Sequence, residues 1–497
     1  MFNKKQGVHL YLNIKNLMDV IREEEDKDDD LKRTLHRLQT YFVGQAKLIN
    51  ESKIGFVEKH TAGRTHVVIE FDEENDDFYK TMLELTVKLF IFNNKTFNNL
   101  SKYKDYPNFK AHAGLDFGDY YEYTINEYLD DEEFTTIGGV ANNSAKIQSY
   151  APKDYIYITK KLYDNLPSVY QDKFSELDDG EKSEFNEKIR SSRFFKTHYK
   201  DIFSDDELIS LEEDLSKVKE RVEDEANGLN LKSISFESCK NQLTFDGLSL
   251  KGKNKRLEEV CVICADIRGF TKLFHVSDQN LDDLKEVMEL IYGIMNDVTI
   301  ESLGSRVQYQ GDRILSVYND FKGSEDSILR MFKAALSLNT KIEELNSNLY
   351  VQEKLNNQKI FIGIGCSIGK VIATRLGLNG RKDKIILSDA YKYANKSEDN
   401  YAGAGEIVIW KKLKEAIDSK VENSDESEYQ VIQDVLTAIS TTGFYSFNIT
   451  EEDFNDLVQQ KNDLNESVNN VFKSSTLNNL TSRTPNVQVD PWSKSND

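Results

Sequence analysis

The sequence predicts an α+β protein that contains two copies of one domain plan. Strand-like and helix-like segments follow one another in the same order twice, about 250 residues apart. Apolar residues over 281–301 recur every three or four positions, as on the core-facing stripe of a helix. The 497 residues, 39% of them hydrophobic and 11% aromatic, can fill two or three cores. We therefore expect each copy to have a strand–helix–strand–strand–helix–strand core.

The first copy begins with a strand-like run over 8–13. The elements expected after it are a helix over 31–49, strands over 54–60 and 65–71, a helix over 77–96, strands over 108–116 and 118–124, a helix from about 137 and a strand over 155–158. Glycines between paired strands favour tight turns at Gly63 and at Gly118.

The second copy repeats this order. Its expected elements are a strand over 260–265, a helix over 281–301, strands over 306–310 and 313–318, a helix over 325–346, strands over 360–368 and 370–375, a helix over 388–399 and a strand over 406–409. Gly369 is expected to supply a turn, as Gly118 does in the first copy.

The segment between the copies is charged, and its acidic helix over 205–227 is most simply a spacer. We therefore divide the chain into an N-terminal domain over 1–200, a linker over 201–257 and a C-terminal domain over 258–450. Residues 475–497 are rich in Ser, Asn and Thr without periodicity, which predicts a flexible tail.

The bulk composition favours an acidic protein that meets its ligands through local basic residues. A formal charge of −21 argues against nucleic acid and against an anionic membrane as partners. No apolar signal core and no 18-residue apolar stretch is present, so we expect a cytoplasmic protein. Four cysteines make no disulfide framework, and Cys261 and Cys264 lie in an apolar strand, where we expect them buried and reduced.

Two aspartates of the second copy carry the chemistry. Asp266 ends an apolar strand before a turn at Gly269, and Asp312 follows Gly311 between two apolar strands. Each alone has a simpler interpretation, Asp266 as a helix N-cap and Asp312 as a turn residue. Together they suit two divalent cations that hold an attacking and a leaving oxygen. The sequence thus predicts a site for two Mg²⁺ or Mn²⁺ ions that carry a triphosphate.

Four landmarks in order carry a resemblance to a known family. They are Asp-Ile-Arg-Gly-Phe-Thr at 266–271, Gly-Asp at 311–312, Gly-Ile-Gly-x-x-x-Gly at 363–369, and Gly-x-x-x-Asn-x-x-x-Lys at 138–146. This set resembles the class III nucleotide cyclase catalytic domain, over about 8–160 and 258–447. The resemblance implies two ferredoxin-like domains paired head to tail, with an active site at their interface. It implies that one partner supplies both metal-binding aspartates and that the other supplies base-selecting residues, an Asn and a basic residue.

The two copies divide these parts between them. Asp266 and Asp312 lie in the second copy, whereas the first has Asn13 and Arg64 at the matching positions, which cannot bind two cations. Conversely, the first copy has the helix pair Asn142 and Lys146, four residues apart and so on one face. The second copy has Lys392 and Lys396 at those positions. The sequence therefore predicts one complete composite site in each chain.

The resemblance also implies roles for these residues. Lys146 would face the charge that develops on the transferring phosphoryl group, where the family usually has Arg, and Asn142 would orient the ribose. Ile267 is placed with the metal ligands. Backbone N–H groups from Ile267 to Phe270, including that of Gly269, would face the phosphates. Arg381 matches a residue that binds the terminal phosphates, and Lys196 is a looser candidate for that role. A helix-start Asn, a solvated Lys and a surface Arg are the simpler alternatives.

The base is inferred from what the sequence lacks. Adenylyl cyclases of this class read adenine with a Lys before the Gly-Asp turn and an Asp before the later helix, and the matching positions here are His60 and Thr135. The Glu/Cys pair typical of guanine is absent too, and the second copy has Gln308 and Tyr309 there. The pattern looks most like the Pycsar pyrimidine cyclases of bacterial antiphage defence. That resemblance implies UTP first and CTP second as substrate, with a separate effector protein that senses the cyclic nucleotide.

Two alternatives stay open. One is a conventional adenylyl or guanylyl cyclase with an unusual base pocket. The other is a pseudoenzyme that binds a nucleotide and signals by conformation; the degraded first copy favours it, and the intact Asp266 and Asp312 oppose it.

Overall fold

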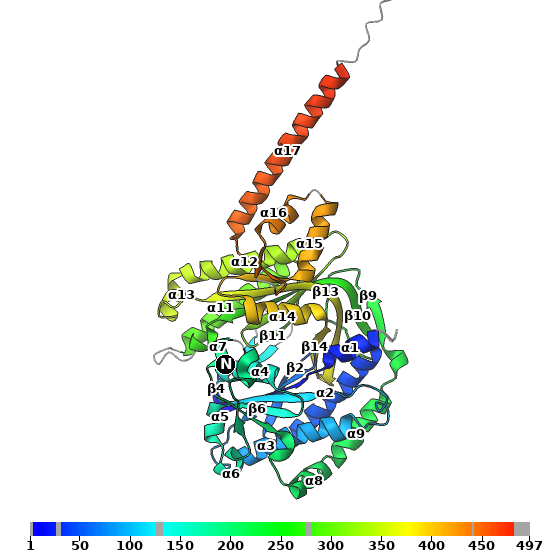
Figure 1. The fold of residues 1–497 in the computed structure, drawn as a ribbon, viewed down its shortest axis with the longest axis vertical. Helices are drawn as coiled ribbons and strands as arrows, with labels where there is room; N and C mark the ends of the chain where they lie inside the picture. The colour runs from blue at the N-terminus through cyan, green and yellow to red at the C-terminus, as the bar shows by residue number, and fades with distance from the viewer. Residues whose placement is uncertain are drawn as a thin grey trace, which may run out of the picture.

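The computed structural model describes residues 3–25, 31–125, 133–185, 187–273, 281–424, 426–439 and 442–481 (Figure 1). Within these ranges the strands form two mixed sheets, one from each half of the chain, and helices pack on both (Figure 1). The helix α17 (Glu451–Thr481) projects from the C-terminal half along the long axis of the molecule. The prediction of an α+β protein with two sheet-bearing domains is confirmed.

The first sheet has the order β2-β3-β1-β4-β6-β8-β7, with β5 paired to β4. Its strands are β1 (Asn3–Ile14), β2 (Gly55–Thr61), β3 (Arg64–Glu70), β4 (Ala111–Ile125), β5 (Glu133–Ile137), β6 (Tyr155–Thr159), β7 (Ser175–Glu176) and β8 (Phe194–His198). The pairing of β4 with β6 is parallel, and the other pairings are antiparallel. The alternate residues Val8, Leu10 and Leu12 of the central β1 are at most 1% exposed, because one face of the strand meets the covering helices.

The second sheet repeats this order as β11-β12-β10-β13-β15-β17-β16, with β14 paired to β13 and β9 to β10. Its strands are β9 (Ser235–Ser238), β10 (Lys253–Arg268), β11 (Ser305–Gln310), β12 (Arg313–Asn319), β13 (Phe361–Leu378), β14 (Arg381–Leu387), β15 (Ile407–Trp410), β16 (Thr437–Ile439) and β17 (Phe444–Phe447). In this sheet β10 takes the place of β1, and β13 that of β4.

The helices follow the predicted order. In the N-terminal half and the connecting segment they are α1 (Leu17–Glu25), α2 (Lys32–Ser52), α3 (Phe78–Ile91), α4 (Gly139–Tyr150), α5 (Lys160–Asn165), α6 (Ser168–Gln171), α7 (Glu187–Arg190), α8 (Asp205–Glu213) and α9 (Ser216–Gly228). In the C-terminal half they are α10 (Phe270–Leu273), α11 (Leu281–Glu301), α12 (Ser327–Ser347), α13 (Leu349–Lys354), α14 (Asp389–Tyr401), α15 (Lys411–Asn423), α16 (Ser427–Val435) and α17. The apolar stripe predicted for 281–301 is confirmed, because Leu284, Val287 and Ile291 are fully buried.

A glycine in each sheet lets one helix lie directly on the strand. A Cβ atom at Gly114 of β4 would come within 2.4 Å of the Ser144 carbonyl oxygen on α4. At Gly365 of β13 it would come within 2.1 Å of the Ala394 carbonyl oxygen on α14. The two helices therefore occupy equivalent places in the two halves. Ser144 of α4 corresponds to Ala394 of α14, and the other residues of the two helices correspond at the same spacing.

The expected turns at Gly118 and Gly369 are wrong. Gly118 pairs with Gly7 inside β4, and Gly369 pairs with Val260 inside β13, so both lie within long strands. The chain reverses later, and in the second half it does so next to Gly380, whose φ of +88° favours glycine. A glycine inside an apolar run has the same sequence signature as a hairpin turn, but it can also continue a strand.

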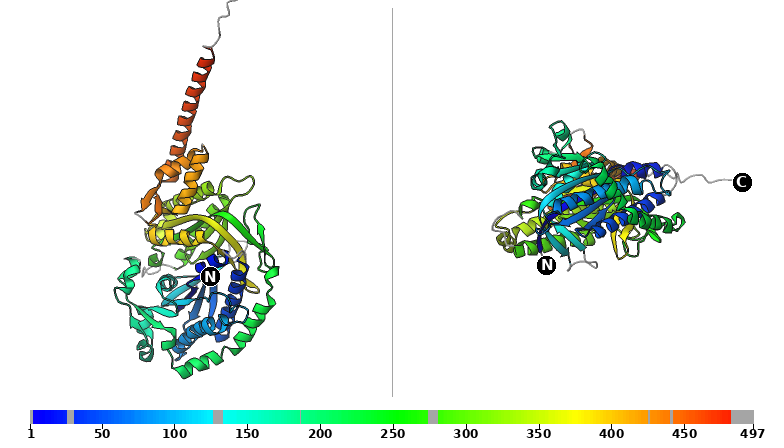
Figure 2. Two further views of the ribbon diagram at one scale, coloured as in Figure 1. Left: turned by 45° about the vertical axis from the view of Figure 1, so that its right-hand side comes forward. Right: turned by 90° about the horizontal axis from the view of Figure 1, so that it is seen from below.

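The connecting segment packs on the N-terminal half. The acidic helix expected over 205–227 is divided into α8 and α9, which run along the outside of that half (Figure 2). Leu211, Val218 and Val222 are at most 7% exposed and belong to its core. At the other end of the chain, α17 extends to Thr481 and so includes the first residues of the expected tail, while 482–497 lie outside the described ranges.

No helix in the described part of the chain is both long enough and apolar enough to cross a membrane. Cys261, Cys264 and Cys366 are buried free thiols in the second sheet, as expected for structural cysteines.

Replacing His36 by Gln tests a buried histidine that joins α2 to the connecting segment. One ring nitrogen of His36 lies 3.0 Å from the Leu229 carbonyl oxygen, the other lies 2.6 Å from the Tyr103 hydroxyl, and burial lowers the pKa of His36 to about 4. The unfolded chain takes up this proton near pH 6.5, before the folded chain does. The wild type should therefore lose about 1.4 kcal/mol of unfolding free energy per pH unit, relative to His36→Gln, as the pH falls from about 6.5 towards 4. Urea unfolding of both proteins at several pH values measures this difference, and parallel pH profiles would contradict it.

Candidate functional site

A cleft between the two halves contains the main residues that the sequence singled out. Asp266 and Asp312 of the C-terminal half and Asn142 and Lys146 of the N-terminal half all line it, and its volume is about 130 Å³. We call it the catalytic cleft. The pairing of strands and helices thus brings together side chains that are more than a hundred residues apart in the chain.

Asp266 lies near the end of β10, where it pairs with Arg313 on β12 and Gly363 on β13. Its side chain is 20% exposed and accepts a hydrogen bond of 3.2 Å from Arg268 Nη1. The Arg268 guanidinium lies directly over Gly363, where an added Cβ would come within 2.2 Å of it. Glycine at 363 is therefore required for this arginine to reach Asp266.

Asp312 lies in the turn between β11 and β12. Gly311 begins the turn with a φ of +67°, a conformation that favours glycine. Asp312 is 2% exposed, and burial, with the nearby negative charge of Asp266, raises its pKa well above the usual range. A buried carboxyl group whose pKa is raised by a neighbouring carboxylate fits a site that a cation neutralises.

A buried ion-pair cluster lies behind the two aspartates. Glu398 of α14 is fully buried and forms ion pairs with Arg268, at 2.6 Å, and with Arg313. Burial, with the negative charge of Asp266, raises the pKa of Glu398 above its usual range, and the two guanidinium groups oppose this effect. The cluster fixes Arg268 and Arg313 on either side of Asp266, because Arg313 is also its neighbour on β12.

The donor set suits hard divalent cations. Within the described ranges, no group of three or more His, Cys, Asp or Glu side chains is arranged to hold a metal ion alone. A metal ion would therefore rely on Asp266, Asp312 and substrate phosphate oxygens, which is the usual manner of Mg²⁺ binding. Ile267 is 3% exposed with its side chain in the core, so only its carbonyl oxygen could be a ligand.

The strand register corrects the correspondence between the two hairpins. Thr61 pairs with Arg64 in the first half, and Gln310 pairs with Arg313 in the second. Asp312 therefore corresponds to Gly63, and Arg64 corresponds to Arg313. The expected match of Arg64 to Asp312 is wrong by one residue. Both turns have two residues, but glycine is the second of them at 62–63 and the first of them at 311–312. Asn13 and Gly63 stand at the aspartate positions, and neither is a carboxylate.

A neutral network replaces the charged cluster in the first half. Asn13 Nδ2 lies 3.3 Å from His112 Nε2, and Gln148 Nε2 lies 2.8 Å from the same nitrogen. His112 and Gln148 stand where Gly363 and Glu398 stand in the second half. Asn13 and Lys392 line a separate cleft of about 240 Å³, which is the counterpart of the catalytic cleft.

The helix α4 presents the predicted pair to the cleft. Asn142 is partly buried and Lys146 is exposed, on the face that meets the C-terminal half. Lys146 also lines a smaller recess of about 40 Å³ with Arg268 and Ile189 of α7. Two cationic side chains, one from each half, thus border the same space. Sequence reasoning placed no residue of α7 here.

His60 and Thr135 do not line the catalytic cleft. His60 is 2% exposed and stacks on Phe42 with ring centroids 4.1 Å apart, and Thr135 is fully buried. The neighbouring Lys59 and Thr136 line the cleft instead. The register explains this. The expected base-reading residue lies four positions before the counterpart of Asp312, and because that counterpart is Gly63 and not Arg64, the residue is Lys59 and not His60. A β-bulge between Val57 and Lys59 also shifts which side chains of β2 face the cleft.

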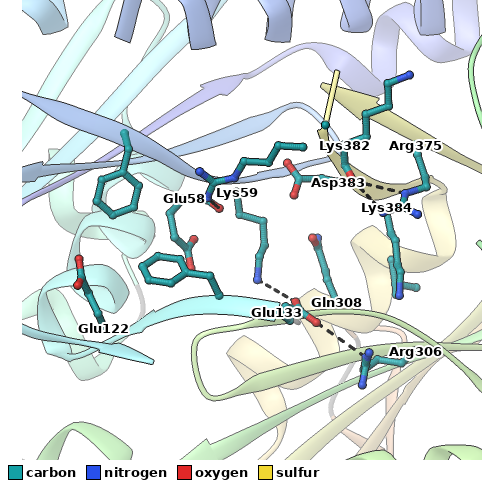
Figure 3. A pocket seen from close by; sticks show the side chains of 15 residues that line it. Glu58, Lys59, Glu122, Glu133, Arg306, Gln308, Arg375, Lys382, Asp383 and Lys384 are labelled. Atoms are coloured by element: carbon teal, nitrogen blue, oxygen red, sulfur yellow. Dashed lines mark hydrogen bonds and ion pairs between the residues drawn. The ribbon is translucent and has the colours of Figure 1, made fainter. Parts of the chain in front are cut away.

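Lys59 joins the halves. Its ammonium group lies 3.0 Å from Glu133 Oε1 of β5 (Figure 3). It also donates a hydrogen bond to the Tyr309 carbonyl oxygen of β11. Beside it, Glu58 accepts a 2.6 Å contact from His66 and a hydrogen bond from the Thr136 backbone N–H. These contacts hold the Glu58 carboxylate ionised, and its pKa is lowered to about 2 despite burial.

The remaining predicted residues lie elsewhere. Arg381 lines a different, larger cleft and donates to the Glu58 carbonyl oxygen at 3.3 Å. Lys196 of β8 forms an ion pair with Glu181 and lines neither cleft. Gly269, with a φ of +76°, and Phe270, 2% exposed, form the turn into α10.

Comparison with known proteins assigns the fold. Residues 253–437 match the family described as the adenylate and guanylate cyclase catalytic domain. A class III adenylyl cyclase-like ATP-binding protein from Pseudomonas aeruginosa has 17% identity and a TM-score of 0.68, with 92% of this chain and 91% of that chain covered. The adenylyl cyclase CyaB from P. aeruginosa has 19% identity and a TM-score of 0.32, with 40% of this chain and 98% of that chain covered. No curated protein sequence matches the chain.

Residues 253–437 of the C-terminal half are therefore similar to the adenylate and guanylate cyclase catalytic domain. The likeness of the Pseudomonas ATP-binding protein extends over both halves, and it confirms the predicted fold of two cyclase-type domains in one chain.

Metal binding tests the geometry of the catalytic cleft. Asp266→Asn and Asp312→Asn should each weaken Mn²⁺ binding about 10-fold or more, because each removes one of two anionic ligands. Asn13→Ala is the matched control and should leave binding unchanged, because Asn13 lines the counterpart cleft. The electron paramagnetic resonance signal of free Mn²⁺ measures the bound fraction. An equal loss in the control would show that the halves are assigned in reverse.

Proposed function

We propose that this protein is a nucleotide cyclase, which converts a ribonucleoside triphosphate to a 3′,5′-cyclic nucleotide and pyrophosphate. The observation that carries the proposal is the meeting of Asp266 and Asp312 with Asn142 and Lys146 in one cleft between the halves. The metal-binding groups come from one half and the phosphate-facing groups from the other, so a nucleotide in the cleft would lie between them.

The reaction is an in-line displacement at the α-phosphorus. The 3′-oxygen forms a bond to phosphorus as the bond to the bridging oxygen of the pyrophosphate breaks, and the hydroxyl proton passes to solvent. Divalent cations held by Asp266, Asp312 and the Ile267 carbonyl would supply charge neutralisation and a more acidic 3′-hydroxyl. The protein itself contributes orientation and fixed positive charge.

Lys146 and Asn142 supply the part played by the N-terminal half. The exposed ammonium of Lys146 can approach the charge that develops on the α-phosphoryl oxygens. Removing one such donor typically costs about 3–4 kcal/mol of transition-state stabilisation. Asn142, one turn earlier on the same face of α4, is placed to hold the ribose.

The proposal also includes the base of the substrate nucleotide. UTP is our first candidate and CTP the second, because the cleft of about 130 Å³ must open to admit a nucleotide and a pyrimidine needs the least opening. Lys59 and Glu58, which both line the catalytic cleft, give one donor and one acceptor, which suits the uracil edge and the adenine edge alike. That pair is the specific observation in favour of ATP as an alternative substrate. With a pyrimidine product, the resemblance to the Pycsar cyclases extends the proposal to antiphage signalling through a separate effector.

Turnover with each of the four ribonucleoside triphosphates in Mn²⁺, followed by mass spectrometry, tests the proposal. Asp266→Asn and Asp312→Asn should each lower kcat at least about 100-fold while the fold persists, because both hold the charge that the reaction needs neutralised. Asn13→Ala should retain activity. Nucleotide binding without any cyclic product would favour the pseudoenzyme alternative and overturn the proposal.

Lys59→Met tests which residues read the base. The substitution should raise KM about 10-fold or more for the preferred triphosphate, because a buried donor is lost. His60→Phe is the control, and it should leave the order of substrates unchanged because His60 stacks on Phe42 outside the cleft. A changed order of substrates in His60→Phe alone would contradict the register described above.

A further inference from the structure

A larger cleft lies beside the catalytic cleft, where the hairpin of β13 and β14 crosses the N-terminal half (Figure 3). We call it the arm cleft, and its volume is about 690 Å³, within the usual range for small-molecule sites. Its lining residues are Phe56, Glu58, Lys59, Glu122, Glu133, Phe134, Arg306, Val307, Gln308, Arg375, Gly380, Arg381, Lys382, Asp383 and Lys384. Asp266, Asp312, Asn142 and Lys146 are not among them, so it is a separate space that shares Glu58 and Lys59 with the catalytic cleft.

The two walls of the arm cleft differ in chemistry. The N-terminal wall presents two partly buried aromatic rings, Phe56 and Phe134, with centroids 5.7 Å apart and planes at 68°. The C-terminal wall presents a cluster of cations from the β13–β14 arm, drawn together at the right of Figure 3. An aromatic surface opposite a basic surface suits a ligand with a flat ring and an anionic group.

Two of the arm's guanidinium groups, those of Arg375 and Arg381, have no carboxylate partner among the described residues. Arg375 donates to the Lys382 carbonyl oxygen at 3.3 Å, and Arg381 donates to the Glu58 carbonyl oxygen at 3.3 Å. Among the described residues, no carboxylate lies within 4.0 Å of either guanidinium. By contrast, Lys59 and Arg306 both face Glu133, at 3.0 and 3.8 Å. The arm therefore keeps cationic groups whose charge a phosphate would satisfy.

A buried polar atom points to a ligand as well. Gln308 is 4% exposed, its Nε2 donates to Thr61 Oγ1 at 2.9 Å, and its Oε1 has no partner among the described residues. Figure 3 shows the Gln308 amide pointing into the cleft between Lys59 and Asp383. A buried acceptor without a donor costs free energy, and a ligand N–H group, such as that of a nucleobase, would satisfy it.

We propose that the arm cleft is a second nucleotide-binding site, in which the base lies against Phe56 and Phe134 and the phosphate meets Arg375 and Lys382. The ligand is a nucleoside phosphate, which can come from the free nucleotide pool or from the cyclic product. The site differs from the catalytic cleft because fixed cations of the chain, rather than divalent metal ions, hold the phosphate.

Occupancy of the arm cleft acts on the catalytic cleft through the shared wall. Glu133 accepts from Lys59 and from the Tyr309 backbone N–H at 2.8 Å, and Tyr309 precedes the turn that carries Asp312. The ligand contacts both halves, so it stabilises their closed arrangement and increases affinity at the catalytic cleft. Linkage requires that a nucleotide in the catalytic cleft increase affinity at the arm cleft by the same factor.

Equilibrium dialysis of the full chain in EDTA tests the proposal, because metal-dependent binding at the catalytic cleft is then suppressed. The probes are UTP, ATP, 3′,5′-cyclic UMP and 3′,5′-cyclic AMP. We expect one nucleotide to bind per chain, with affinity weakened about 10-fold or more by Arg375→Gln or Lys382→Gln. Asp266→Asn and Asp312→Asn should leave it unchanged. The tighter class, triphosphate or cyclic monophosphate, identifies the source of the ligand.

The controls separate a site from general attraction of anions. Lys322→Gln removes the same charge at an exposed position outside the cleft and should leave binding intact. Phe134→Ala should weaken nucleotide binding but not pyrophosphate binding, because it removes the ring contact alone. No nucleotide binding in EDTA, equal binding by Arg375→Gln and Lys382→Gln, or pyrophosphate binding as tight as that of nucleotides would each overturn the proposal. Unfolding temperatures of all variants confirm that the fold persists.

Discussion

The catalytic cleft depends on one buried charge cluster, in which Glu398 lies between Arg268 and Arg313. Glu398 reaches this place because Gly365 lets α14 lie directly on β13, and Arg268 reaches it because Gly363 has no side chain. A charge left alone in such a cluster typically costs about 3–5 kcal/mol, so the three residues hold each other in position. Two glycines and one carboxylate thus determine where the arginines beside Asp266 can lie.

The N-terminal half shows what the same fold does without these charges. Asn13, His112 and Gln148 form a neutral network at the equivalent positions, and these three side chains carry no negative charge that would attract a cation. Burial lowers the pKa of His112 to about 3, so its ring is uncharged there at neutral pH. The half without these carboxylates instead contributes α4, whose Asn142 and Lys146 line the cleft with the other half. One composite site and one degenerate counterpart follow from this asymmetry.

Much of this arrangement could be predicted from the sequence, because periodicity and turn residues are local signals. The two-copy plan, the strand order around Asp266 and the face shared by Asn142 and Lys146 all follow from such signals. The register of the β2–β3 hairpin could not be predicted, because glycine is the second residue of its turn (Ala62-Gly63) and the first residue of the turn in the second half (Gly311-Asp312). Matching Gly63 to Gly311 shifts the correspondence by one residue, so His60 was expected where Lys59 lies. Long-range contacts such as the ion pairs of Glu398 leave no mark in local sequence.

The charge of the whole chain explains why the nucleotide binding proposed for the two clefts needs local cations. With a formal charge of −21, the protein repels anions at long range. Phosphates then bind only where cations gather in low-dielectric surroundings, and Lys59 lies on the wall between two such places. Its side chain is 6% exposed and is held by Glu133 and by Tyr309 of the opposite half. A buried ammonium group cannot lose these partners without a cost in free energy. A ligand that changes the contacts of Lys59 in one cleft therefore also changes its contacts in the other cleft.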